Sequence, residues 1–222
     1  MLVDAYGFPP TLTDDPQKGT MSTTIVHLVR HGEVFNPERI LYGRLPDYHL
    51  SERGQAMAQA TAASFEGHDV AILRSSPLER AQETAAPIAE ATGLDNGIDE
   101  DLLEAGNRYE GLHVKGVRSQ LWNPVRWPLM YNPTLPSWGE HYDDIVERMM
   151  AAIERARRDA KGHEAVLVSH QLPIVCVQRH VQGKPLAHNP AVRQCDLASV
   201  SSLVFRGRDL IDYIYSEPAQ EI

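Results

Sequence analysis

The stretch TIVHLVRHG, residues 24–32, begins as an apolar run and ends in Arg-His-Gly. Such a run predicts a buried strand over 25–30 that is followed at once by His31 and Gly32. Open α/β sheets bind ligands beyond the carboxyl ends of their strands, and a glycine there lets a ligand approach the backbone. His31 is therefore a candidate nucleophile beside an anion-binding group, Arg30.

Strand and helix patterns alternate along the rest of the chain. The apolar runs that we assign to further strands are 70–74, 164–169, 201–205 and 210–215, of which the last two form a hairpin. The segments with a helical pattern are 51–65, 77–92, 140–161 and one that opens at Pro173. Strands separated by helices predict a single α/β domain whose mostly parallel sheet is covered by helices on both faces.

Two of the predicted helices begin with capping residues. Ser51 is a suitable N-cap for 51–65. The sequence Ser76-Pro77-Leu78-Glu79 is typical of a capping box with proline at the first helical position, which places Arg80 one turn into the helix. A strand, a helix start and an arginine in this order predict an anion site.

Several short motifs follow one another in a fixed order. They are Arg30-His31-Gly32-Glu33, Gly43-Arg44, LSERGQ at 50–55, SSPLERAQETA at 75–85, Glu104, Glu110-Gly111, Gly139-Glu140 and Val168-Ser169-His170. Together they resemble the histidine phosphatase superfamily, the phosphoglycerate-mutase-like group, over about 23–215. The resemblance is weakest between 112 and 138.

This resemblance implies a phosphoryl-transfer site. A phosphomonoester dianion must be neutralised before a nucleophile reaches phosphorus, and the guanidinium groups of Arg30 and Arg80 suit that task. His31 must be neutral to attack and form a phosphohistidine, whereas His170 is expected to be protonated next to the bound anion. By resemblance, Glu104 is the acid that protonates the leaving oxygen.

Some parts of the predicted site leave alternatives open. The stretch 104–110 is about one residue shorter than the family pattern, so three other carboxyl groups remain alternative acids: Glu33, Glu100 and Asp101. Asn36 is a candidate phosphate contact, although it lies one residue closer to His31 than the usual asparagine. Gly43 and Arg44 are expected to line the same pocket, or to form an ordinary turn with an exposed arginine.

The segment 112–138 is individual to this chain. It contains Trp122, Trp127, Tyr131, Trp138 and four prolines, so it cannot form one regular helix. In the family that it resembles, such an irregular insertion lies over the active site. Its aromatic residues would then contact substrate or simply pack the insertion onto the domain.

Three classes of function compete. We expect a metal-independent, cofactor-free phosphatase that hydrolyses a small phosphomonoester. A phosphoglycerate mutase-type isomerase is the alternative, but the Arg-His-Tyr-Gly-x-Leu motif of true mutases is absent from the sequence, which has Asn107-Arg108-Tyr109-Glu110-Gly111 instead. A non-catalytic binding protein is disfavoured by the intact Arg30, His31, Arg80 and His170.

The composition limits the classes of partner and the cellular compartment that we expect. The net charge of −9 argues against nucleic acid, but local arginines can still bind a small phosphorylated substrate. Cys176 and Cys195 lack metal-ligand spacing, and no apolar stretch reaches the length of a membrane span, so we expect a cytoplasmic protein with inert thiols and no membrane contact. Residues 1–20 have no periodicity and predict a flexible tail before a domain over 21–222, with Met21 as a possible start. The sequence indicates no particular oligomeric state.

Overall fold

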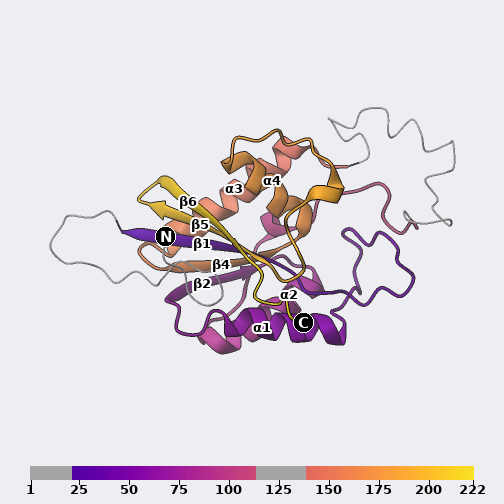
Figure 1. Cartoon of the computed structure of the whole chain (residues 1–222), viewed down its shortest axis with the longest axis horizontal. Coiled ribbons are helices and arrows are strands. Elements are labelled where there is room, and N and C mark those ends of the chain that lie inside the picture. The colour runs from indigo at the N-terminus through magenta and orange to yellow at the C-terminus, as the bar shows by residue number, and fades with distance from the viewer. Residues whose placement is uncertain (1–21, 114–138) are drawn as a thin grey trace.

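A mixed six-stranded sheet forms the centre of the molecule, whose computed structural model describes residues 22–113 and 139–222 (Figure 1). The strands are β1 (Thr23–Arg30), β2 (Val70–Ser75), β3 (Gly97–Ile98), β4 (Glu164–Ser169), β5 (Val200–Arg206) and β6 (Asp209–Ser216). Their order is β3-β2-β4-β1-β5-β6. The first four are parallel, and β5 and β6 form the predicted antiparallel hairpin at one edge. The predicted, mostly parallel sheet is confirmed, although the short edge strand β3 was not foreseen.

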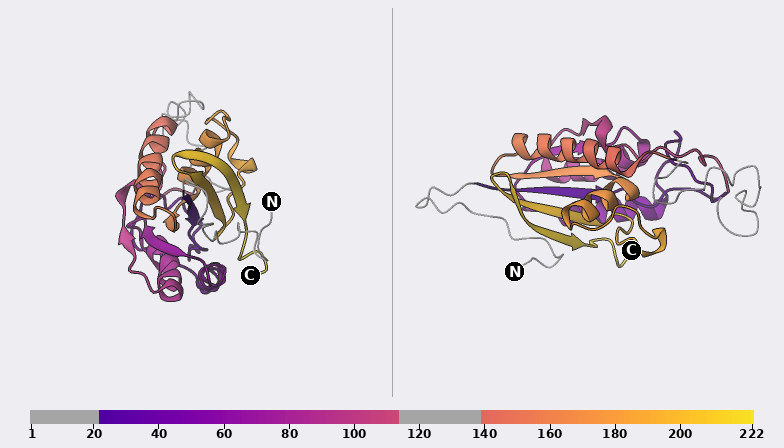
Figure 2. Two further views of the ribbon diagram at one scale, coloured as in Figure 1. Left: turned by 90° about the vertical axis from the view of Figure 1, so that its left-hand side faces the viewer. Right: turned by 90° about the horizontal axis from the view of Figure 1, so that it is seen from above.

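Helices cover both faces of this sheet, as predicted (Figure 2). They are α1 (Glu52–Ala63), α2 (Glu79–Thr92), α3 (Tyr142–Asp159) and α4 (Gln171–Val181). Buried side chains such as Phe65 and Ile88 join α1 and α2 to one face. Met149 and Ile174, on α3 and α4, belong to the cluster on the other face. Both faces of the apolar strands are therefore shielded from solvent, which explains why apolar and polar residues do not alternate along them.

One predicted helix start is correct and the other is wrong. The Ser51 side chain caps α1 by accepting a hydrogen bond from the Gly54 amide (3.0 Å). The helix α2, however, begins at Glu79 with Leu78 as N-cap and has no side-chain cap. The Ser76 hydroxyl lies 2.8 Å from Nε2 of His170, so this contact between elements replaces the predicted capping box.

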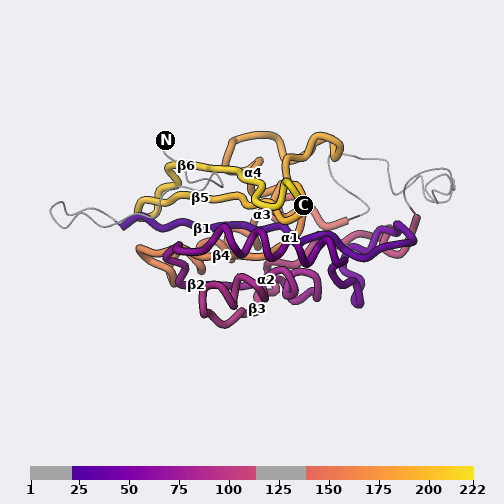
Figure 3. Tube along the Cα trace, turned by 60° about the horizontal axis from the view of Figure 1, so that its bottom comes forward, coloured from indigo at the N-terminus to yellow at the C-terminus, as the bar shows by residue number. Residues whose placement is uncertain are grey.

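Strand register sets the positions of two predicted site residues. Arg30, at the end of β1, pairs with Ser169 at the end of parallel β4, so His31 and His170 leave the same edge side by side. The His31 amide donates to the Ser169 carbonyl (3.1 Å), and the His31 carbonyl accepts from the Ala198 amide (3.3 Å). The chain between β1 and α1 then extends beyond this edge (Figure 3).

The predicted tail at 1–20 and residues 114–138 of the predicted insertion lie outside the described residues. Within the described ranges, no helix is both long and apolar enough to cross a membrane.

Candidate active site

His31 is held in one orientation at the end of β1. The imidazole is buried, and Nδ1 lies 2.8 Å from the carbonyl oxygen of Gly32. A carbonyl can only accept, so Nδ1 carries the proton and Nε2 keeps its lone pair. Burial lowers the pKa of His31 well below its ordinary value, and the positive charges of Arg30 and Arg80 lower it further. The ring is therefore neutral and has a free nucleophilic nitrogen.

Glycines make room for this arrangement. A Cβ atom on Gly32 would come within 2.5 Å of the Gly54 carbonyl oxygen, and one on Gly54 would come within 2.0 Å of the Glu33 carbonyl oxygen. The loop after β1 can therefore pack against the start of α1 only because both side chains are absent.

Two guanidinium groups lie beside His31 with part of their hydrogen-bonding capacity unused. Arg30 donates from Nη1 to the Cys195 carbonyl (2.6 Å), and Arg80 donates from Nη2 to the Gly43 carbonyl (2.6 Å). Within the described part of the chain, Nε of Arg30 and both Nε and Nη1 of Arg80 are buried without a partner. An unpaired buried donor is costly, and an anionic ligand supplies the missing acceptors.

His170 lies beside His31 at the same edge of the sheet. It follows β4 as the N-cap of α4, and its ring centroid lies 5.2 Å from that of His31. Nε2 contacts Ser76 Oγ, whereas Nδ1 is buried without a described partner. Burial, then His31 and Arg80, lower the pKa of His170, which favours the neutral ring. A bound phosphate dianion acts in the opposite direction and favours its protonation.

The surroundings of Glu104 favour the protonated form of its carboxyl group. It is partly buried, and desolvation raises its pKa, although the hydrogen bond from the Ala105 amide (2.8 Å) opposes this effect. The charges of Arg80 and Arg30 act on the same carboxyl, which places it near the two arginines. A carboxyl group with a raised pKa suits a general acid.

The alternative acids are engaged elsewhere. Glu33 accepts from Ser51 (2.8 Å) and pairs with Arg53 (2.9 Å), and these hydrogen bonds lower its pKa. Asp101 pairs with Arg155 (2.7 Å), and Glu100 is exposed. The geometry therefore favours Glu104 among the four carboxyl groups.

The three predicted substrate contacts differ in their surroundings. Asn36 bonds through both side-chain atoms to the backbone of Ile40, so it closes a local turn. Gly43 has φ +45° and presents its carbonyl to Arg80, which makes it part of the pocket wall. Arg44 is bound by the Glu104 carbonyl (2.6 Å) and the Glu140 carboxylate (2.8 Å). Asn36 and Arg44 thus bond to partners within the protein.

Two pocket residues were missed from the sequence. The Tyr42 ring lies beneath the Arg80 guanidinium at 4.9 Å and 6.4 Å from the His31 ring. Arg193 lies close enough to Glu104 for its charge to act on that carboxyl. Neither belongs to a motif with a strand or helix signal: Arg193 lies in irregular chain between α4 and β5. The one sequence signal for Tyr42 was its position directly before Gly43 and Arg44, which were expected to line the pocket.

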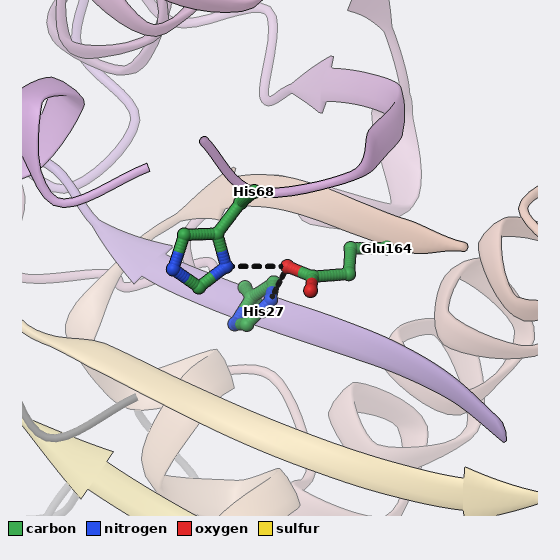
Figure 4. A group of neighbouring side chains, drawn as sticks. All are labelled: His27, His68 and Glu164. Carbon is green, nitrogen blue, oxygen red and sulfur yellow. Dashed lines mark hydrogen bonds and ion pairs between the residues drawn. The ribbon is translucent and has the colours of Figure 1, made fainter. Parts of the chain in front are cut away.

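A second polar cluster, whose side chains are of the types that bind metal ions, is formed by His27, His68 and Glu164 (Figure 4). His27 Nε2 and His68 Nδ1 each lie 2.9 Å from Oε2 of Glu164, and His27 Nδ1 lies 2.8 Å from Ser202 Oγ. The three donors lie within 4.8 Å of one another, as a metal site requires. These atoms already form hydrogen bonds within the cluster, so their hydrogen-bonding capacity is satisfied by the protein itself.

The two cysteines are buried free thiols within the described ranges. Desolvation raises the pKa of Cys176 to about 12 and that of Cys195 to about 11. A thiol needs its thiolate form to react or bind metal, so neither side chain is suited to nucleophilic chemistry near neutral pH.

Comparisons with known proteins agree with this geometry. The model of the histidine phosphatase superfamily, branch 1, matches residues 26–211. An uncharacterised protein of Mycobacterium tuberculosis, Rv0525, is 50% identical over 197 residues, which are 88% of this chain and 97% of the relative. A Shigella boydii protein described as "Probable phosphoglycerate mutase GpmB" is 30% identical over 79% of this chain and 83% of its own length. The structure of mycobacterial glucosyl-3-phosphoglycerate phosphatase Rv2419c is similar with a TM-score of 0.68 and 26% identity, and the match covers 87% of this chain and 97% of that one.

Proposed function

Because the chain belongs to the histidine phosphatase superfamily, we propose that it hydrolyses a small phosphomonoester through a phosphohistidine on His31. The observation that carries this proposal is the pairing of a neutral imidazole, whose Nδ1–H is fixed by Gly32, with the unpaired donors of Arg30 and Arg80. The imidazole supplies the electron pair, and the guanidinium groups supply the charge that phosphoryl transfer requires.

In the first step, Nε2 of His31 attacks phosphorus while the bond from phosphorus to the ester oxygen breaks. Glu104 gives its proton to the departing alkoxide and becomes a carboxylate. Arg30, Arg80 and the protonated His170 stabilise the charge on the non-bridging oxygens. The products are a free alcohol and the phosphohistidine.

In the second step, the Glu104 carboxylate takes a proton from a water molecule. The resulting hydroxide attacks phosphorus, and the bond between nitrogen and phosphorus breaks. Inorganic phosphate leaves, Glu104 is protonated again and His31 is neutral. The arginines carry the neutralising charge throughout, so these steps use no metal ion.

A mutase remains the second candidate, because the chain is 30% identical to the GpmB protein of Shigella boydii. A mutase would return the phosphoryl group from His31 to the substrate instead of to water. The sequence around 107–111 lacks the motif expected of true mutases, which supports hydrolysis.

The deciding experiment combines phosphate release with exchange. We expect release of inorganic phosphate from at least one member of a panel of phosphorylated sugars and glycerates, and protein denatured at alkaline pH during turnover should carry an acid-labile, base-stable phosphoryl label on His31. Exchange between 2- and 3-phosphoglycerate should be negligible. Efficient exchange with little release would make the protein a mutase, and label on His170 would refute the assigned nucleophile.

A further inference from the structure

We propose that Arg193 forms a second anion subsite, so that the preferred substrate carries a carboxylate in addition to its phosphoryl group. This inference rests on the proposed phosphatase function and specifies its substrate class. Its basis is a guanidinium group that is joined to the reaction pocket but has no acidic partner within the described ranges.

Hydrogen bonds hold Arg193 beside the pocket. Its Nε donates to Nε2 of His188 (2.9 Å) and its Nη1 donates to Oε1 of Gln171 (3.3 Å). The Gln171 side chain in turn donates to the Cys195 carbonyl (3.3 Å), which also accepts from Arg30. Gln171, the residue that follows His170, therefore orients the Arg193 side chain. Because Gln171 and Arg30 both donate to the Cys195 carbonyl, Arg193 is also linked to a phosphate-binding arginine.

These partners are all neutral. His188 Nδ1 lies 2.6 Å from the Leu186 carbonyl and must donate to it, so Nε2 is the acceptor of a neutral ring. Desolvation lowers the pKa of His188, which agrees with that form. Gln171 carries no charge. Arg193 therefore keeps its full positive charge in a partly buried position, and desolvation lowers its pKa as well.

Apart from Arg30 and Arg80, which are assigned to the phosphoryl group, three other arginines have acidic partners. Arg44 and Arg148 share Glu140 at 2.8 and 2.7 Å, and Arg155 pairs with Asp99 at 2.9 Å. No carboxylate of the described residues lies within 4.0 Å of Arg193. Glu104 is near enough to act electrostatically on Arg193, but it forms no ion pair with it, and desolvation raises the pKa of this carboxyl group.

The unused donors of Arg193 identify the chemistry of its partner. Arg30, Arg80 and the protonated His170 are assigned to the phosphoryl group, and Arg193 is a further cation that can pair with a second negative group on the substrate. Nη2 of Arg193 makes no hydrogen bond to the described residues, and its contact with Gln171 is long. A carboxylate can accept from both Nη1 and Nη2 in the paired geometry that guanidinium groups favour.

The test compares two ligands that differ at one group. Both 3-phosphoglycerate and glycerol 1-phosphate have three carbons and one phosphoryl group, but only the former has a carboxylate. Binding is measured by calorimetry on the His31→Ala protein, which does not consume the ligand. We expect 3-phosphoglycerate to bind at least 10-fold more tightly, and Arg193→Met to reduce this preference to less than about 3-fold.

Arg193→Lys keeps the charge and should retain an intermediate preference, which a purely structural role would not produce. Arg158→Met is the matched control, since Arg158 is exposed on α3, pairs with Glu154 (3.9 Å) and should leave both affinities unchanged. Equal affinity for both ligands in the parent protein, or equal weakening of both by Arg193→Met, would overturn the proposal. Failure of the wild type to release phosphate would instead refute the proposed function, because the binding comparison does not depend on turnover.

Discussion

Two clusters that contain histidine lie along β1, and they differ in how completely their polar atoms are paired. In the core cluster, His27 bonds to Ser202 and Glu164, and His68 bonds to the same Glu164 carboxylate, at the amino end of β4. In the reaction pocket, formed by Arg30, His31, Arg80, Glu104 and His170, several buried nitrogen atoms have no described partner. Both clusters are buried and polar, so burial alone does not distinguish them.

The difference shows which feature indicates a ligand site. Buried polar groups normally find partners within the protein, as the core cluster does. The reaction pocket leaves buried donors unpaired at the edge where β1 and β4 end, and a phosphoryl group would satisfy them. We therefore expect substitutions in the core cluster to change stability and those in the pocket to change turnover.

Replacing one histidine from each cluster gives the largest expected contrast. His31→Gln removes the nucleophile and should reduce kcat by at least about 10⁴-fold, as the loss of a catalytic nucleophile does in other enzymes. His68→Gln should keep kcat/KM within about 3-fold of the wild-type value, a change of less than about 1 kcal/mol in activation free energy. Steady-state phosphate release measures both. Comparable losses in the two variants would remove the functional distinction between the clusters.

Replacing one glutamate from each cluster separates acid catalysis from stability. Glu104→Gln cannot protonate the leaving oxygen and should slow hydrolysis of alkyl phosphates by about 10²- to 10³-fold. Nitrophenyl phosphate should lose less than about 10-fold, because nitrophenolate leaves without a proton. The contrast requires that breakdown of the phosphohistidine does not limit both substrates. Equal losses on both would return the role of acid to Glu33, Glu100 or Asp101.

Glu164→Gln should change stability instead. The hydrogen bonds from His27 and His68 overcome desolvation and lower the pKa of Glu164 from 4.5 to about 2, a difference that corresponds to about 3 kcal/mol. A lowered carboxyl pKa stabilises the fold fully above pH 4.5, and the contribution disappears as the pH falls toward 2. Urea unfolding should therefore show a deficit of about 3 kcal/mol at pH 7 that shrinks below pH 4.5, with kcat/KM unchanged. A deficit that is independent of pH would contradict this assignment.

The smallest expected effect is that of metal removal. Chelators should leave phosphate release unchanged, because guanidinium groups supply the charge in the pocket and the donors of the core cluster bond to one another. Activity and melting temperature would be measured before and after dialysis against a chelator. A loss that one divalent ion restores would refute the metal-independent mechanism, and a fall in melting temperature alone would indicate a metal in the core cluster.

The sequence predicted the sheet and its covering helices because their apolar patterns are local. The runs at 25–30 and 164–169 need no information from elsewhere in the chain to indicate buried strands, and β1 and β4 follow them closely. The edge strand β3 has two exposed residues and therefore no apolar signal. The capping box at Ser76 failed because a distant residue, His170, binds the same hydroxyl.

The candidate site was predictable where a motif is fixed to a strand or helix end. His31, His170 and Arg80 follow from such motifs, and the structure brings their side chains to one edge. Arg193 could not be predicted, because an irregular loop places it there and no local pattern describes that loop. Asn36 is the opposite case. The sequence predicted it as a phosphate contact, but its side chain forms hydrogen bonds with the backbone of Ile40.

The position of β1 between β4 and β5 has a consequence for motion. The His31 backbone is bonded on one side to Ser169 and on the other to Ala198, so the nucleophile sits on rigid chain. Its amide hydrogen should exchange with solvent only in openings that separate β1 from β4, far more slowly than amides of the exposed loop near Arg39. Little conformational entropy is then left to lose when the imidazole aligns with phosphorus, and changes in the surrounding loops can alter the accepted substrate without loosening the attacking group.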